Sequence, residues 1–188
     1  MNPVFKHNLA EAVAMIESLA ELETKVQDAA GLIASVLNGG HKLLACGNGG
    51  SAAEAAHLTT EFVGRFDRDR RPYPAICLSA HAGDLTAIGN DYAFDDVFVR
   101  QLEAFAQPGD VLVAFSTSGN SENVRRALQG AGTLKIHTIA LLGRGGGRCA
   151  GLASLELVVR SNITARIQEG HQFLLHTICE MVELQLRD

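Results

Sequence analysis

The stretch "DVLVAFSTSGNSENVRRALQGA" (residues 110–131) contains the pattern that decides the fold. It begins with a short apolar run and continues through six positions, 116–121, that hold four hydroxyl side chains, one glycine and one asparagine. Its last part has the apolar spacing of a helix. A buried strand, a polar loop and a helix in this order form half of a parallel α/β unit. The loop is therefore predicted at the carboxyl end of a strand, where sheets of this kind bind ligands.

The same order recurs on both sides of this stretch. Continuous apolar runs of this length are typical of parallel strands that are covered on both faces. The fold class predicted is α/β, a flavodoxin-like three-layer sandwich in which helices flank a five-stranded parallel sheet. The strands are expected at 42–46, 73–78, 110–115, 135–141 and 155–159, and the helices that follow the first of them at 51–66, 81–91, 94–105, 120–131 and 163–186.

The N-terminal part adds helices to this sandwich. Residues 4–37 have apolar side chains at steps of three and four, with one break expected near Glu21, and "NGG" (38–40) ends the pattern. We therefore expect one domain over residues 1–188, in which residues 1–38 form a helical segment. The apolar stripe of this segment is compatible with an oligomer surface and equally with packing on its own sheet.

Composition and charge exclude some classes of function. The net charge of −5 provides no broad positive field for nucleic acid or for an anionic membrane. No apolar stretch reaches the length of a membrane span, and the N-terminus has no cleavage signature, so a cytoplasmic protein is expected. The four cysteines are scattered and are expected to be reduced structural thiols.

Two loops follow strands and precede helices, "GNGGS" (47–51) and "STSGNS" (116–121). A helix N-terminus offers free N–H groups and positive potential, which favours an anion such as phosphate. The alternative is that serine and asparagine only cap the helices while glycine makes the turns. "GNGGSA" also fits the loose dinucleotide pattern, but the acidic residue expected at the end of the next strand is missing, since Asp84 comes well past it.

Two helices carry candidate reactive groups. His57 and Glu61 are spaced i, i+4 on the helix after the first loop, and Gln168, Gln172 and His176 repeat at the same spacing on the final helix. Imidazole and carboxylate groups so placed bind a divalent metal or transfer protons. The competing interpretations are an ordinary surface pair for the first set and a packed core histidine for the second.

Four segments carry a resemblance to a known family: "CGNGGSAAEAAHLTTEFVGRF" (46–66), "AIGNDYAF" (87–94), "PGDVLVAFSTSGNSENV" (108–124) and "ARIQEGHQFLLH" (165–176). Together they resemble the sugar isomerase (SIS) family, and within it the phosphoheptose isomerases. This resemblance implies an aldose–ketose isomerase that converts sedoheptulose 7-phosphate, through an enediol, to D-glycero-D-manno-heptose 7-phosphate. That reaction is the first step of nucleotide-activated heptose biosynthesis for lipopolysaccharide core or capsule.

The resemblance also implies roles for particular residues. It makes Glu61 and His176 the catalytic acid–base residues, and it implies one zinc ion per subunit, held by His57, Glu61, Gln168 and His176. A homotetramer with sites at subunit interfaces is implied as well. Ala165 departs from the acidic residue that some members have there. The residues matched to the binding of the substrate and its phosphate are Asn48, Gly49, Gly50, Ser51, Glu61, Arg65, Asn90, Asp91, Ser116, Thr117, Ser118, Ser121 and Gln168.

The spacing of the expected zinc ligands and two alternative functions bear on the implied isomerase. Gln168 and His176 are about 12 Å apart along a helix, so we expect the site to draw on more than one copy of the chain. One rival is a non-catalytic SIS protein that binds the replication initiator, but those relatives lack the acid–base pair that Glu61 and His176 provide here. The other rival is an isomerase of a different sugar phosphate, which the sequence leaves open.

Overall fold

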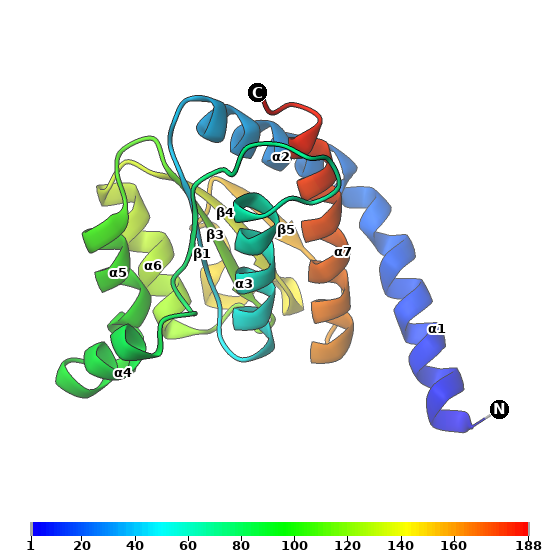
Figure 1. Cartoon of the computed structure of the whole chain (residues 1–188). Coiled ribbons are helices and arrows are strands. Elements are labelled where there is room, and N and C mark those ends of the chain that lie inside the picture. Colours follow the sequence, from blue (N-terminus) through cyan, green and yellow to red (C-terminus); the bar gives the residue numbers. More distant parts are fainter. Residues whose placement is uncertain (1, 188) are drawn as a thin grey trace.

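A five-stranded parallel sheet forms the centre of the protein. The computed structural model describes residues 2–187, and its strands lie in the order β2-β1-β3-β4-β5 (Figure 1). All neighbouring pairs are parallel, which confirms the predicted fold class. The strands are β1 Leu43–Cys46, β2 Ala75–Cys77, β3 Val111–Ser116, β4 His137–Leu142 and β5 Leu155–Val158.

Helices cover both faces of this sheet. One face is covered by α2 (Glu23–Asn38), α3 (Gly50–Val63) and α7 (Thr164–Glu183), with α1 (Pro3–Ser18) beside α7. The other face is covered by α5 (Val97–Phe105) and α6 (Glu122–Thr133), with α4 (Ala82–Asp91) at their end. The short 3₁₀ helices are η1 Leu19–Leu22, η2 Phe94–Asp96 and η3 Arg144–Cys149.

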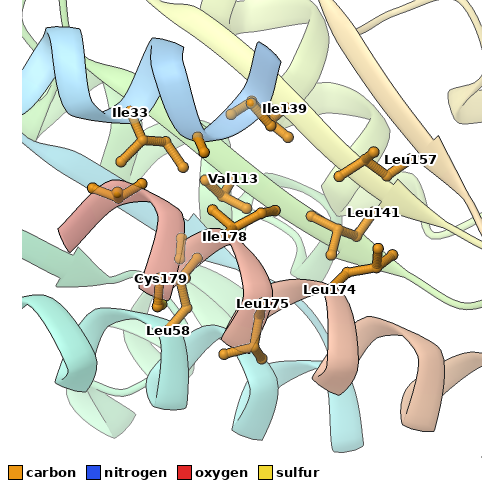
Figure 2. Close-up of a cluster of buried hydrophobic side chains, with 14 of the residues drawn as sticks. Ile33, Leu58, Val113, Ile139, Leu141, Leu157, Leu174, Leu175, Ile178 and Cys179 are labelled. Atoms are coloured by element: carbon orange, nitrogen blue, oxygen red, sulfur yellow. The ribbon is translucent and has the colours of Figure 1, made fainter. Parts of the chain in front are cut away.

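Alternation along each strand divides the core in two. Leu43 and Ala45 of β1 belong to the cluster under α2, α3 and α7, whereas Leu44 and Cys46 belong to the cluster under α5 and α6. Successive side chains of a strand point to opposite faces, so a strand covered on both sides is apolar at every position. Figure 2 shows the first cluster, which includes Ile178 of α7 and Val113 of β3.

The N-terminal helices break where the sequence predicts, at η1, which contains Glu21. From there α1 runs away from the sheet and projects beyond the rest of the chain (Figure 1). Val4, Phe5 and Leu9 on α1 are 65%, 58% and 50% exposed, so this apolar stripe is not covered by the chain's own sheet. Its use as an oligomer surface stays a prediction.

Several predicted boundaries were wrong. Helix α3 ends at Val63 instead of residue 66, because the backbone of Gly64 (φ −83°, ψ −119°) leaves the helix. Strand β2 is only three residues long, and α7 ends at Glu183 instead of residue 186. The segment "GRGGGR" (143–148) forms most of η3, in which three successive glycines have positive φ.

The cysteine prediction is confirmed, because all four residues lie within the described range and are free thiols. Burial raises the pKa of the Cys179 thiol to about 12 and raises that of Cys46 as well. These thiols are therefore protonated packing groups at neutral pH. Over residues 2–187, no helix combines the length and the apolar character that crossing a bilayer requires.

Candidate functional site

The two predicted loops lie next to each other at the carboxyl edge of the sheet. Strands β1 and β3 are neighbours in the sheet. From β1 the chain passes to β2 on one side of β1, and it then returns to β3 on the other side. This is the point where the strand order reverses, the usual ligand position in open α/β sheets. Loop 47–51 leads into α3 and loop 116–121 leads into α6, so helix N-termini from both faces meet at this edge.

Glycine shapes the first loop. Gly49 has φ +58° and precedes α3 without any side-chain cap, which leaves the first N–H groups of the helix without that partner. Ser51 is 4% exposed and lies in the first turn. The carboxamide of Asn48, predicted to lie near the sugar, is engaged with Asn123 of α6 through two hydrogen bonds of 2.8 and 3.0 Å. Asn48 therefore joins the first loop to the helix that follows the second.

Three hydroxyls of the second loop make hydrogen bonds within the loop. The Ser116 Oγ, almost fully buried, accepts from the Gly119 N–H at 3.1 Å and donates to the Ser121 Oγ at 3.3 Å. The Ser118 Oγ accepts from the N–H of Asn120 at 3.1 Å. Ser121 occupies the N-cap position of α6, yet its side chain makes no capping hydrogen bond. The capping interpretation therefore does not account for this hydroxyl.

The reactive groups of α3 and α7 meet in space. His57 Nε2 lies 2.8 Å from Glu61 Oε1, and the His57 and His176 ring centroids are 5.0 Å apart. Nitrogen and oxygen atoms of His57, Glu61 and His176 all lie within 4.8 Å of one another. All three side chains are partly exposed, so a ligand has access to them. The sequence identified these three residues, and the fold brings them together within a single chain.

Gln172 is a member of this cluster that the sequence assigned no role. Its Nε2 lies 3.0 Å from His57 Nδ1 and 2.8 Å from His176 Nε2. The Gln172 amide therefore bridges the two imidazole rings. The signal for Gln172 was its place midway along the stripe from Gln168 to His176.

The donor set of the cluster fits a divalent zinc ion. Neutral imidazole nitrogens and a carboxylate oxygen are the ligands that zinc takes in catalytic sites. Three such groups already converge here without any rearrangement of the backbone. A zinc ion would be held by His57, Glu61 and His176, with a glutamine of α7 beside it.

Gln168 lies at the other end of the stripe, against the first loop. A Cβ atom built on Gly50 would lie 2.0 Å from Gln168 Nε2, so the glycine makes room for this amide. Gln168 and Gly50 border a depression of about 480 Å³ together with Ala53, Glu54, His57, Glu169 and Gln172. The predicted zinc contact of Gln168 stays a prediction.

Buried polar groups lie beside this depression. The Glu54 Oε2 lies 3.5 Å from His171 Nδ1, and His171 is fully buried against the ring of Phe115. Neither that oxygen nor the His171 nitrogens have a hydrogen-bond partner among the described residues.

Three other predicted residues lie outside the cluster. Arg65 follows α3 on an exposed loop and donates from Nη1 to the Asp67 carbonyl at 2.5 Å. Asn90 and Asp91 end α4, where the Asn90 amide donates to the Asp91 carboxylate at 2.8 Å. Helix α4 packs on η2 and α5, and within residues 2–187 no hydrogen bond joins this pair to the cluster of α3 and α7.

Known proteins resemble this chain in sequence. Residues 7–143 match the family described as SIS domain. A phosphoheptose isomerase of Aquifex aeolicus (strain VF5) is 48% identical over 180 residues, which cover 96% of this chain and 93% of that relative. A phosphoheptose isomerase of Citrifermentans bemidjiense is 50% identical over 177 residues, covering 94% and 92%.

Solved structures agree over almost the whole chain. The phosphoheptose isomerase GmhA of Neisseria gonorrhoeae superimposes with a TM-score of 0.90 at 40% identity, covering 96% of this chain and 97% of that one. A phosphoheptose isomerase of Francisella tularensis gives a TM-score of 0.92 at 33% identity, covering 98% and 100%.

Proposed function

The chain belongs to the SIS-domain family and, within it, to the phosphoheptose isomerases, and from that membership we propose its reaction. It is an aldose–ketose isomerase that converts sedoheptulose 7-phosphate to D-glycero-D-manno-heptose 7-phosphate at the start of heptose biosynthesis. The observation that carries this proposal is the convergence of His57, Glu61 and His176, with Gly50 of the first loop on the same depression as His57. A cradle for an anion and a group of proton carriers are the two parts that such a reaction needs.

The chemistry moves two protons between neighbouring positions. A hydrogen leaves C1 of the ketose and arrives at C2 of the aldose, while the hydroxyl proton of O1 passes to O2; the enediol lies between them. We assign the carbon proton to the Glu61 carboxylate, which removes it from C1 and returns it to C2. His176, whose Nε2 lies 2.8 Å from the Gln172 amide, serves the two oxygens.

His57 orients the base. Its Nε2 lies against Glu61 Oε1 and its Nδ1 lies 3.0 Å from the Gln172 amide, so the ring is held between these two side chains. The hydrogen bond to Glu61 at 2.8 Å fixes one carboxylate oxygen and leaves the other for the substrate.

Zinc, one ion per subunit, is the proposed cofactor, with His57, Glu61, Gln168 and His176 as its ligands. When bound, it supplies a Lewis acid that polarises the sugar oxygens. Glu61 cannot be a tightly held ligand and a free base at the same moment, so these two roles alternate.

The loops hold the inert end of the sugar. The phosphate is carried by C7, far from the reacting C1 and C2, so binding and chemistry occupy separate parts of the site. Hydroxyl and N–H groups can donate to phosphate oxygens without a lysine. We assign this role to Gly49, Gly50, Ser51, Ser116, Thr117, Ser118 and Ser121, and contacts along the sugar to Asn48, Arg65, Asn90, Asp91 and Gln168.

We also propose a cytoplasmic homotetramer with sites at subunit interfaces. Two observations support it: α1 exposes an apolar stripe, and the predicted sugar contacts of α4 lie apart from the cluster within one chain. A Leu9→Glu variant is expected to sediment as a smaller species than the unmodified protein. Retention of a tetramer by that variant would contradict this use of α1.

The decisive experiment compares substrates. Ketose phosphates of five, six and seven carbons are incubated with the purified chain, and the aldose product is followed in a coupled assay beside a measurement of bound zinc. Turnover that is fastest with sedoheptulose 7-phosphate supports the proposal. Faster turnover of a shorter sugar would assign the site to another isomerase, and binding without turnover would assign it to a regulatory protein.

A further inference from the structure

A buried ion pair joins the two helices that carry the proposed catalytic residues. Arg70 lies on the loop after α3 and Glu183 is the last residue of α7, and their side chains are 6% and 5% exposed. The Arg70 Nε donates to Glu183 Oε1 at 3.0 Å. Neither residue is part of the predicted site.

The guanidinium group of Arg70 also reaches the end of α3. Its Nη2 donates to the carbonyl of Glu61 at 2.7 Å, and its Nη1 donates to the carbonyl of Phe62 at 3.2 Å. The last carbonyls of a helix have no partner within the helix, so Arg70 completes this terminus. One of the two carbonyls belongs to the proposed base itself.

The carboxylate of Glu183 holds the loop that follows. It accepts from the backbone N–H groups of Phe66, Asp67 and Arg68 at 3.3, 3.1 and 2.9 Å. Burial alone would raise the pKa of Glu183, but hydrogen bonds from Arg68, Asp67 and Arg70 outweigh it and hold the pKa below its usual value. The carboxylate is therefore charged at neutral pH.

This loop borders the reactive cluster. The ring of Phe66 lies 5.8 Å from the ring of His176, centroid to centroid. Glu183 follows His176 by seven residues, which is two turns of helix and places both on one face of α7. The ion pair therefore connects the backbone of Glu61 to the helix face that carries His176.

Stability is a weak reason for such a pair. Desolvation of two charges often cancels their attraction, and apolar replacements are frequently as stable. Position is a stronger reason, since a misplacement of about 1 Å can slow a reaction about a hundredfold. We propose that Arg70 and Glu183 are a positioning pair that sets the separation of Glu61 and His176 and fixes the loop bearing Phe66.

Three variants separate positioning from stability, and the assay rests on the proposed isomerase function. Arg70→Lys keeps the charge but not the fork of donors to the carbonyls of Glu61 and Phe62. Glu183→Gln removes the charge and also loosens the loop. Asp110→Asn is the control, because Asp110 is equally buried and paired with Lys42 at 2.6 Å, beside the amino ends of β1 and β3.

Each variant is assayed where circular dichroism shows that it is folded. Arg70→Lys is expected to lower kcat about ten- to a hundredfold with KM changed less than about threefold. Glu183→Gln is expected to lower kcat similarly and to raise KM as well, because Arg65 lies on the loosened loop. The control keeps kcat within about twofold, whatever its loss of thermal stability. Folded Arg70→Lys and Glu183→Gln proteins with the kcat of the unmodified protein would overturn the proposal.

A second measurement does not depend on turnover. The nuclear Overhauser effect between the imidazole protons of His57 and His176, whose centroids lie 5.0 Å apart, is expected in the unmodified protein and in Asp110→Asn. It is expected to weaken in Glu183→Gln and Arg70→Lys. If the unmodified protein fails to isomerise any sugar phosphate, the proposed function is wrong, and the nuclear Overhauser effect alone tests the positioning pair. An unchanged effect in both variants would refute the positioning pair.

Discussion

The turns that begin α3 and α6 have the same construction and different contents. Both follow paired strands, and each contains a glycine with positive φ, Gly49 at +58° and Gly119 at +63°. Loop 116–121 has four hydroxyls, but α6 presents an ion-paired surface formed by Glu122, Arg125 and Arg126. Loop 47–51 has one hydroxyl, and α3 carries His57 and Glu61. The first turn leads into a helix with candidate reactive groups, and the second contains most of the hydroxyls that we propose to hold the phosphate.

In the proposed division of labour, loop 116–121 only binds the phosphate, whereas the α3 unit combines phosphate contacts at its first turn with the reactive groups His57 and Glu61. A change at His57 or Glu61 should therefore alter kcat, and a change in loop 116–121 should alter KM.

The largest effect is expected from Glu61→Gln. The amide keeps the shape of the side chain but cannot accept the carbon proton, so kcat should fall about a hundred- to ten-thousandfold. Exchange of solvent deuterium into the sugar should fall in parallel, measured by NMR in D₂O. Glu103→Gln, at an exposed position of α5, is the matched control. Unchanged turnover in Glu61→Gln would remove Glu61 from the role of base.

The Ser118→Ala variant tests whether loop 116–121 binds the phosphate. Loss of one hydrogen bond to a charged group costs about 1.5–3 kcal/mol, so KM should rise by about tenfold or more. The inhibition constant of inorganic phosphate should rise with it, while kcat stays within about threefold. A fall in kcat with unchanged KM would show that the loop takes part in the chemistry.

Gly50→Ala tests the contact between the first loop and α7. A new Cβ would displace Gln168, whose side chain is flexible, so the fold should tolerate the change. Alanine also favours a helix over glycine, so the thermal midpoint should not fall. We expect kcat/KM to decrease about three- to tenfold and zinc affinity to weaken. Gly31→Ala in α2, with no atom within 4 Å of the added Cβ, should leave both unchanged.

The smallest kinetic effect is expected from Glu122→Gln on α6. The Arg125 guanidinium, helped by Arg126 and Arg148, lowers the pKa of Glu122 to about 2 against some opposing desolvation. A lowered pKa stabilises the folded state above the unfolded value near 4.5, and this stabilisation is lost as the pH falls toward 2. The thermal midpoints of the variant and the unmodified protein should therefore differ at pH 7 and converge only as the pH falls toward 2. Kinetic constants at pH 7 should be equal.

Much of the fold could be predicted because its signals are local. The apolar strands, the helical spacing and the two polar turns specify a parallel sheet and the edge at which ligands bind. The spacing of His57 and Glu61 placed them on one helix face, where the structure has them. The errors fell at the ends of helices and strands. Helix α3 does not continue past Gly64, and Glu183, 119 residues later in the chain, accepts hydrogen bonds from the N–H groups of Phe66 to Arg68.

Local patterns of residues predict which elements form and which residue types are available for chemistry. Only the tertiary structure decided that Gln172 lies between His57 and His176, that Asn48 pairs with Asn123, and that Arg70 joins Glu61 to Glu183. The reason is physical: periodicity gives the faces of a helix but not its rotation and axial position against a neighbour. Those are fixed by the packing of the whole core, in which α3 and α7 share one apolar cluster.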